Sequence, residues 1–152
     1  MIPYWIGLIV IPAVLFFVDR DALRAVDYPL LLTFTMFFIF SGNMARIGAV
    51  HNLLSALLEK NTLLVSILSC QGISNVPTAI LLSRFTENYR ELLLGVNIGG
   101  TGTLIASLAS LITYSEYKLL HPGDSKRYFA WFTLLNLIFL VVLTVVAYFF
   151  FV

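Results

Sequence analysis

Charge is scarce in this chain. Charged side chains make up only 11% of the 152 residues, whereas hydrophobic residues make up 60%. About a quarter of the residues of a soluble domain are charged, so this balance predicts an integral membrane protein instead. The formal net charge is only +1, which gives no basic surface for nucleic acid. The length fits a single membrane domain, residues 1–152.

Residues that carry enzyme chemistry are also few. Cys70 is the only cysteine, which excludes an intramolecular disulfide and a cysteine metal cluster. His51 is the only histidine near an apolar segment, and we interpret it as part of a solvated polar face. The sequence contains no Ser-His-Asp set, no zinc-ligand spacing and no paired carboxylates within an apolar segment. It therefore predicts no enzyme activity and no cofactor other than a coupling ion such as Na⁺.

Long apolar runs are abundant. Membrane spans are predicted at about residues 2–18, 28–45 and 128–152, each near the length that crosses a bilayer. Residues 47–58 place apolar side chains on one face and polar side chains on the other, which predicts a helix lying in the membrane interface. The predicted fold class is an all-α integral membrane protein, located with several passes in the inner or plasma membrane.

Two further apolar runs, Asn61–Ser83 and Leu92–Ser115, contain no charged residue but are interrupted by polar residues, glycine and proline. The first interruption covers residues 72–78, and the second covers residues 97–103. Irregular backbone at membrane depth is tolerated only where it is buried in protein or lines a cavity. A pair of interrupted hydrophobic segments is the sequence pattern expected of a transporter binding site.

The first break offers oxygen atoms from Ser74, Asn75 and Thr78, together with carbonyl groups that lack a helical partner. Such oxygens suit a hard cation such as Na⁺. Pro77 is expected to start a half-helix whose N-terminus favours an anionic group. We predict a re-entrant helical hairpin over residues 61–84. The alternative is one spanning helix with a proline kink, whose polar side chains bond a neighbouring helix.

The second break combines glycines with hydroxyl and amide side chains, which predicts unwound backbone within a broken helix over residues 89–116. A new half-helix is expected near Thr103. Gly95 and Gly99 also form a GxxxG pair, so the alternative is a continuous helix packed closely against another helix. If the backbone is unwound, substitution of Gly100 should do more damage than substitution of Gly95.

The tip Ser74-Asn75, followed by a half-helix and then by Asn97-Ile98-Gly99-Gly100-Thr101-Gly102-Thr103, resembles the ion transporter superfamily. This superfamily includes divalent anion:sodium symporters, citrate permeases, arsenite-efflux permeases and one type of sodium/proton antiporter. The resemblance covers essentially the whole chain and matches the C-terminal half of such a protein. It implies that each half carries a re-entrant hairpin and an unwound helix, related by an inverted repeat.

The resemblance also implies that the two breaks form one site, with the hairpin tip binding a cation and a substrate carboxylate. The expected ligands of Na⁺ are Ser74, Asn75 and Gly100. The full set of candidate substrate- and ion-binding residues is Ser74, Asn75, Val76, Thr78, Asn97, Gly99, Gly100, Thr101, Gly102 and Thr103.

Two features depart from this family. Val76 stands where sodium-coupled dicarboxylate members typically have threonine, and the N-terminal half is missing. The predicted function is the C-terminal half of a secondary active transporter for a small anion, a carboxylate or an inorganic oxyanion, coupled to Na⁺ or H⁺. The alternatives are a sodium/proton antiporter and a non-transporting membrane assembly or interaction subunit. The expected partners are the lipid bilayer, the N-terminal half as separate chain or missing sequence, or a second copy in a homodimer.

Overall fold

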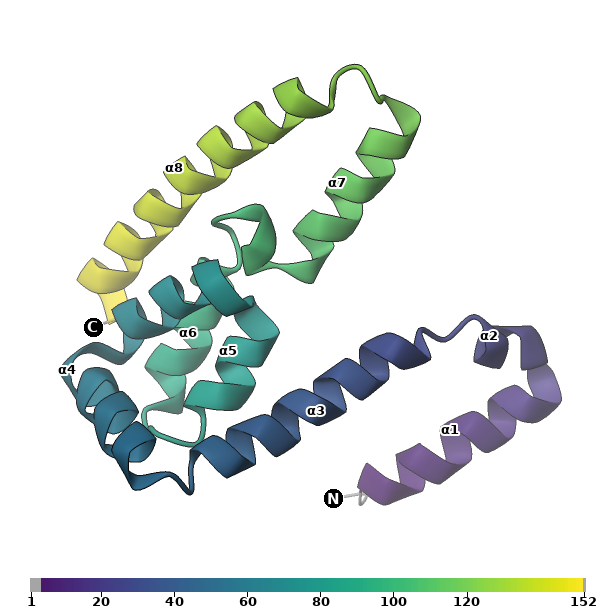
Figure 1. Cartoon of the computed structure of the whole chain (residues 1–152), viewed down its shortest axis with the longest axis horizontal. Helices are drawn as coiled ribbons and strands as arrows, with labels where there is room; N and C mark the ends of the chain where they lie inside the picture. The colour runs from purple at the N-terminus through teal and green to yellow at the C-terminus, as the bar shows by residue number, and fades with distance from the viewer. Residues whose placement is uncertain (1–3, 152) are drawn as a thin grey trace. The chain divides into compact units, whose positions relative to one another are not determined.

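The computed structural model describes residues 4–151, so the outermost residues of the spans predicted at 2–18 and 128–152 lie outside the described residues. Within this range the chain consists of helices and connecting turns, without a strand (Figure 1). It divides into two compact units, one ending at Thr35 and the other beginning at Met36. The elements are α1 (Tyr4–Val18), α2 (Arg20–Arg24), α3 (Tyr28–Met44), α4 (Gly48–Ile73), α5 (Asn75–Leu82), α6 (Tyr89–Gly99), the 3₁₀ turn η1 (Leu104–Ala106), α7 (Leu108–Leu120) and α8 (Ser125–Phe151).

Aspartates set the helix starts in the first unit. Asp19 caps α2, because its Oδ1 accepts hydrogen bonds from the backbone N–H groups of Asp21 and Ala22, both at 3.1 Å. Asp27 does the same for α3 by accepting from Leu30 N at 2.9 Å. Each cap satisfies backbone donors that have no partner within the helix.

Helix α4 is two helices joined at a bend. Asn61 has non-helical dihedral angles, φ −165° and ψ 91°, and its Oδ1 accepts from Leu64 N at 2.7 Å. Asn61 therefore caps a second helix that runs from Thr62 to Ile73. By length and composition, α4 and α8 could each cross a membrane, and shorter apolar helices cover Trp5–Val18 and Tyr28–Met44. Because α4 bends at Asn61, α8 is the only one of these helices that is both continuous and long enough to cross a membrane.

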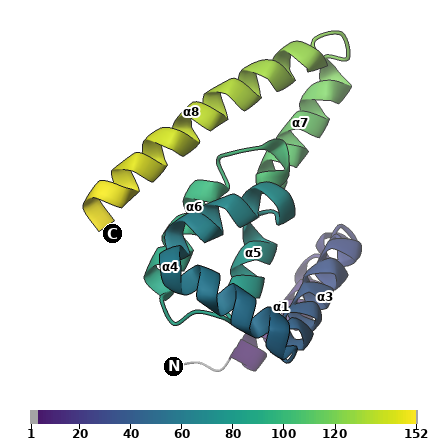
Figure 2. The same ribbon diagram turned by 60° about the vertical axis from the view of Figure 1, so that its left-hand side comes forward.

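The second part of α4 packs against α5 and α6, as Figures 1 and 2 both show. Small residues make the close contact with α6 possible. A Cβ atom at Gly95 would lie 2.7 Å from Ser66 Cβ and 2.8 Å from the Leu63 carbonyl oxygen. At Gly99 it would lie 2.8 Å from Cys70 Cβ. Both glycines are therefore required by the approach of two helix backbones.

The buried core of the second unit surrounds this contact. Its apolar side chains come from both parts of α4, from the end of α5 and from α6. The Ser41 hydroxyl, buried near the end of α3, donates to the Ile80 carbonyl oxygen at 2.9 Å and links α3 to α5. The main cluster consists of Leu58, Cys70, Leu82, Phe85, Leu92 and Val96.

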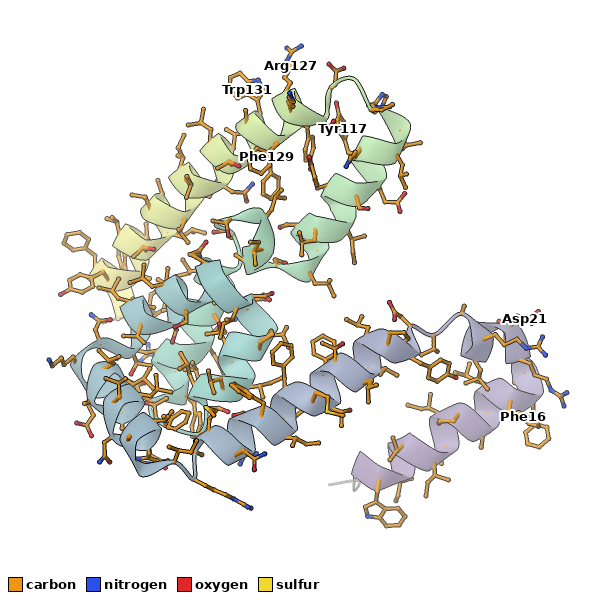
Figure 3. All side chains as sticks on the ribbon, in the orientation of Figure 1. Phe16, Asp21, Tyr117, Arg127, Phe129 and Trp131 are labelled. Atoms are coloured by element: carbon orange, nitrogen blue, oxygen red, sulfur yellow. The ribbon has the colours of Figure 1, made fainter. Side chains whose placement is uncertain are left out.

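Aromatic side chains join α7 to α8 near the turn between them. The rings of Tyr117 and Tyr128 stack at 4.3 Å, and Tyr114 contacts Phe129 edge-on at 6.2 Å. Figure 3 shows Tyr117 and Phe129 on these two helices. Most other side chains of α8 are apolar and exposed. An exposed apolar helix of this length is what a lipid environment requires.

Candidate functional site

The first break is a turn at a single residue. Helix α4 ends at Ile73, α5 begins at Asn75, and Ser74 between them has φ 70° and ψ 160°. Among residues 4–151, Ser74 is the only residue other than glycine with a positive φ. This region of dihedral space is used almost only by glycine, and a residue held there costs about 1–3 kcal/mol. Strain of this kind concentrates at functional sites, so the tip is a candidate site on geometry alone.

The start of α5 lies two residues before the position expected from Pro77. Thr78 N donates to the Ser74 carbonyl oxygen at 3.1 Å, which closes the first turn. Asn75 Oδ1 accepts from the neighbouring Val76 N at 2.9 Å. Pro77 falls inside this first turn, where a missing N–H removes no helical hydrogen bond. The proline therefore stabilises the helix start without defining it.

The second break begins later and lasts longer than the sequence predicts. Helix α6 continues through Gly99, and the chain then tightens, with Thr101 N donating to Ile98 O at 3.0 Å and Gly102 N donating to Gly99 O at 3.2 Å. The next α-helix begins only at Leu108, after η1, rather than near Thr103. Gly99, which was predicted to lie in the break, is instead the last residue of α6 and packs closely against α4.

The glycines of the second break serve close approach and not unusual dihedral angles. No glycine among residues 4–151 has a positive φ, and Gly100 is helical at φ −63° and ψ −16°. A Cβ atom at Gly100 would lie 2.9 Å from Asn75 Nδ2, the end of a side chain that can move. At Gly95 it would meet backbone. For folding, we therefore now expect the opposite order, with substitution of Gly95 more disruptive than substitution of Gly100.

The structure brings the two breaks together. The Asn75 amide lies against Gly100, and Ser74 Oγ donates to the Ala106 carbonyl oxygen at 3.4 Å. Thr101 is half-buried, and its hydroxyl donates to Ile98 O at 2.7 Å within its own segment. The oxygens near the tip are hydroxyl, amide and backbone oxygens, which are the types that bind alkali cations in proteins.

Other predicted residues lie elsewhere. Asn97 is exposed and donates to Leu93 O at 2.7 Å on its own helix. It lines a small, mainly apolar cavity of about 380 Å³ with Arg90 and Phe151, away from the hairpin tip. Val76 is also exposed, at 44% of its surface. The structure therefore gives no contact that joins Asn97 to the tip.

Thr78 is fully buried in α5. The Cys70 thiol lies near it, but no hydrogen bond of ordinary geometry joins Thr78 Oγ1 to a described residue. A buried hydroxyl without a partner costs free energy. Thr78 is close to the hairpin tip in sequence, but its buried side chain is not exposed at the tip.

Gln71 belongs to the site but was not predicted. Its side chain lies between the hairpin and the second break, where Nε2 donates to Gly99 O at 2.8 Å and Oε1 accepts from Thr103 N at 2.8 Å. Its backbone oxygen also accepts from the Thr103 hydroxyl at 3.4 Å. A primary amide within an uncharged apolar run was the available signal, because such a group needs partners for all its polar atoms.

The two ends of the hairpin return to one place. Ser55 in the first part of α4 donates to the Phe85 carbonyl oxygen at 3.3 Å, and a polar cavity of about 820 Å³ opens there. Asn61 and Arg84, at the start and end of the hairpin, both line this cavity. It contains none of the predicted site residues. The cavity is lined by His51, Ser55, Leu58, Glu59, Lys60, Asn61, Thr62, Ser83, Arg84, Phe85, Thr86, Glu87, Asn88, Tyr89 and Glu91.

The chain is similar in sequence to two known proteins. The chain is 48% identical over 90 residues to an uncharacterized transporter of Methanocaldococcus jannaschii, a match that covers 58% of this chain and 25% of that protein. It is 37% identical over 109 residues to the inner membrane protein YbiR of Escherichia coli K12, which covers 70% of this chain and 29% of that protein. No protein-family model and no solved structure matches the chain.

These relatives and the apolar helices together support a membrane protein of a transporter-like family. Neither relative is named as an enzyme, which is consistent with the predicted lack of enzyme chemistry. Their names specify neither the ion transporter superfamily nor a substrate or coupling ion. The matched regions span only a quarter to a third of each relative. The similarity therefore does not extend to the activity of a whole transporter.

Proposed function

We propose that this chain forms part of a secondary active transporter, in which the hairpin tip and the second break make one binding site. The substrate is a small anion, a carboxylate or an inorganic oxyanion, and the coupling ion is Na⁺ or H⁺. The observation that carries the proposal is the close approach of the Asn75 amide to Gly100, where a Cβ atom would lie 2.9 Å from Asn75 Nδ2. This approach brings together two uncharged interruptions of apolar segments. The transporter name of one relative supports the same class.

The chemistry of the tip suits this role. Ser74, the residue before α5, donates from Oγ to the Ala106 carbonyl oxygen, so the start of α5 lies beside the segment that contains Ala106. A helix N-terminus favours an anionic group. Asn75 carries both a carbonyl oxygen and N–H donors, so its side chain can face a cation and an anion at one site. Ser74 and Gly100 supply the further oxygens that we assign to Na⁺.

The hairpin is proposed to be re-entrant. Helix α5 has eight residues, which rise about 12 Å, far less than the ~30 Å of a bilayer core. Asn61 and Arg84 line the same cavity, so the segment returns to the level at which it began. We infer that it enters and leaves on one side of the membrane.

Thiol labelling in sealed vesicles tests this topology. Single cysteines replace Asn61 and Arg84 in a Cys70→Ser background, and an impermeant thiol reagent is added from one side. Both positions should react from the same side. A matched pair at Ser125 and Tyr148, near the two ends of α8, should react from opposite sides. Labelling of Asn61 and Arg84 positions from opposite faces would show a simple span and overturn the hairpin.

The rest of the transporter is proposed to complete the site. Transporter sites of this kind use half-helix ends from two repeats, and this chain offers one hairpin and one broken helix. The second set would come from further sequence on the same or another chain, or from a second copy in opposite orientation. We expect the isolated monomeric chain to show no uptake in liposomes, and uptake to require the partner. Robust uptake by the monomer would contradict this.

One observation favours the alternative of a non-transporting membrane subunit. Gly95 and Gly99 are fully explained by close packing against α4, as expected of an assembly protein. Packing of α6 on α4 does not account for Gly100 or Gly102, which face the polar side chains of Asn75 and Gln71. A sodium/proton antiporter would use the same site without an anionic substrate. Uptake of the anion, measured with and without a sodium gradient, distinguishes this antiporter from the proposed anion transporter.

A further inference from the structure

The side-chain amide of Gln71 has a defined orientation. Besides its bonds to Gly99 O and Thr103 N, its Nε2 donates to Ile67 O at 3.0 Å within α4. Both N–H groups and the oxygen atom are therefore used. Exchange of the amide nitrogen and oxygen would place N–H against N–H at Thr103 and oxygen against oxygen at Gly99. The hydrogen bonds thus fix the side chain in one position.

This amide occupies the place of a helical hydrogen bond. In a continuous α-helix, Thr103 N–H would donate to the carbonyl oxygen four residues earlier, which is that of Gly99. Here Gln71 accepts from that N–H and donates to that carbonyl. A primary amide offers the same donor and acceptor as a peptide group, so it satisfies Thr103 N–H and donates to Gly99 O, which also accepts from Gly102 N at 3.2 Å.

Gly102 makes room for the inserted amide. A Cβ atom at this position would lie 2.6 Å from Gln71 Cδ and would also overlap Oε1. Local backbone preference does not explain the break equally well, because no glycine among residues 4–151 has a positive φ and Gly100 is itself helical. The group that lies at the interrupted position is a side chain from another helix, Gln71.

We propose that Gln71 is a positioning residue that holds the second break open by replacing the Gly99–Thr103 backbone hydrogen bond. It thereby sets the position of the segment 100–103 opposite Asn75. The first statement concerns structure alone. The consequence for transport rests on the proposed function, and the experiment below separates the two.

Amide hydrogen exchange of the full chain in lipid nanodiscs tests the structural statement. The variants are Gln71→Met, which keeps the length but loses the hydrogen bonds, and Gln71→Glu. The matched control is Asn136→Leu, which removes an amide whose only recorded bond, to Phe132 O at 2.9 Å, lies within α8. Exchange at Thr103 N–H is compared with wild type at the same pH, about 3, where a carboxyl group is largely protonated.

Gln71→Met should speed exchange at Thr103 about tenfold, the effect of losing one intramolecular hydrogen bond. Gln71→Glu should restore protection to within about twofold of wild type, because a protonated carboxyl group can also accept from Thr103 N–H and donate to Gly99 O. Asn136→Leu should leave exchange at Thr103 unchanged. If Gln71 acted only by filling space, the methionine and glutamate variants would show the same exchange rate at Thr103.

Unchanged exchange at Thr103 in Gln71→Met, or failure of Gln71→Glu to restore protection, would overturn the proposal. If Gln71→Met gives no folded chain, Gly102→Ala replaces it in the same comparison, since its methyl group displaces the amide. Uptake by the complete transporter is measured in parallel. Lost protection with normal uptake would leave the positioning role intact and contradict the proposed function of the segment.

Discussion

The two interruptions of apolar helices in this chain are held in different ways. The first is a turn at one residue, Ser74, and its geometry is local and strained. The second extends from Gly100 to Ser107, and its ordinary dihedral angles are held by a side chain from the hairpin, Gln71. The difference shows that polar breaks of similar composition can arise from strain within the chain or from contact with another segment.

Substitution of Gly95 should have the largest effect on folding. It tests whether the region before the second break is a helix packed closely against α4 or unwound backbone. Gly95→Val places side-chain atoms against the backbone of α4 and should destabilise the chain by about 3 kcal/mol, the upper end for overpacking. Gly72→Val is the control, because a Cβ atom built there has nothing within 4 Å apart from its chain neighbours and the backbone of its own helix. Thermal unfolding in detergent compares the two.

Equal loss of folded protein in the Gly72 and Gly95 variants would contradict the close packing of α4 and α6. Gly100→Val provides a further comparison. It meets the movable end of Asn75, so it should fold better than Gly95→Val while weakening the proposed site.

Substitution of Ser74 tests the strain assigned to the first break. Ser74→Gly should raise the free energy of unfolding by about 1 kcal/mol, because glycine adopts this conformation without strain. Ser74→Val should lower it by about 1–3 kcal/mol, since a β-branched residue is strongly disfavoured at positive φ. Denaturant unfolding of both variants measures the difference, and the opposite order would rule out strain at the tip.

A double-mutant cycle between Gln71 and Gly102 tests whether the Gln71 side chain lies against the second break at Gly102. Gly102→Ala should be clearly destabilising beside Gln71 and nearly neutral in the Gln71→Ala background, because the added methyl group then has space. The expected coupling is about 1 kcal/mol, typical of residues in contact. Additive effects on thermal unfolding would show that the amide does not occupy this position.

Much of the fold could be predicted from the sequence, because its signals are local. The all-helical class follows from composition, and Ser74 lies within the interruption predicted at residues 72–78. The cap of Asp27 on α3 was likewise readable, since Asp before an apolar run is a helix-start signal. These features depend on residues that are neighbours along the chain.

The rest depended on contacts between distant residues. Gly99 carries no mark that distinguishes close packing against Cys70 from unwinding, and the structure assigns it to packing. Gln71 was missed because its partners, Gly99 at the end of α6 and Thr103 in the second break, become its partners only after α4 and α6 pack together. Asn97 was included for its amide, although that amide bonds its own helix.

The two substitutions with the smallest expected effect on stability, Asn75→Ala and Asn97→Ala, give the most direct test of function. Asn75→Ala and Asn97→Ala each remove one amide that bonds only nearby backbone, so each should change the free energy of unfolding by no more than about 1 kcal/mol. The two variants thus form a matched pair, with one amide at the proposed site and one outside it.

Ion-gradient-driven uptake by the complete transporter, measured for this pair in liposomes, tests the central proposal most directly. Asn75→Ala should abolish coupled uptake, while Asn97→Ala should retain wild-type uptake at equal amounts of inserted protein. Wild-type uptake and ion dependence in Asn75→Ala would contradict the place of the hairpin tip in a transport site.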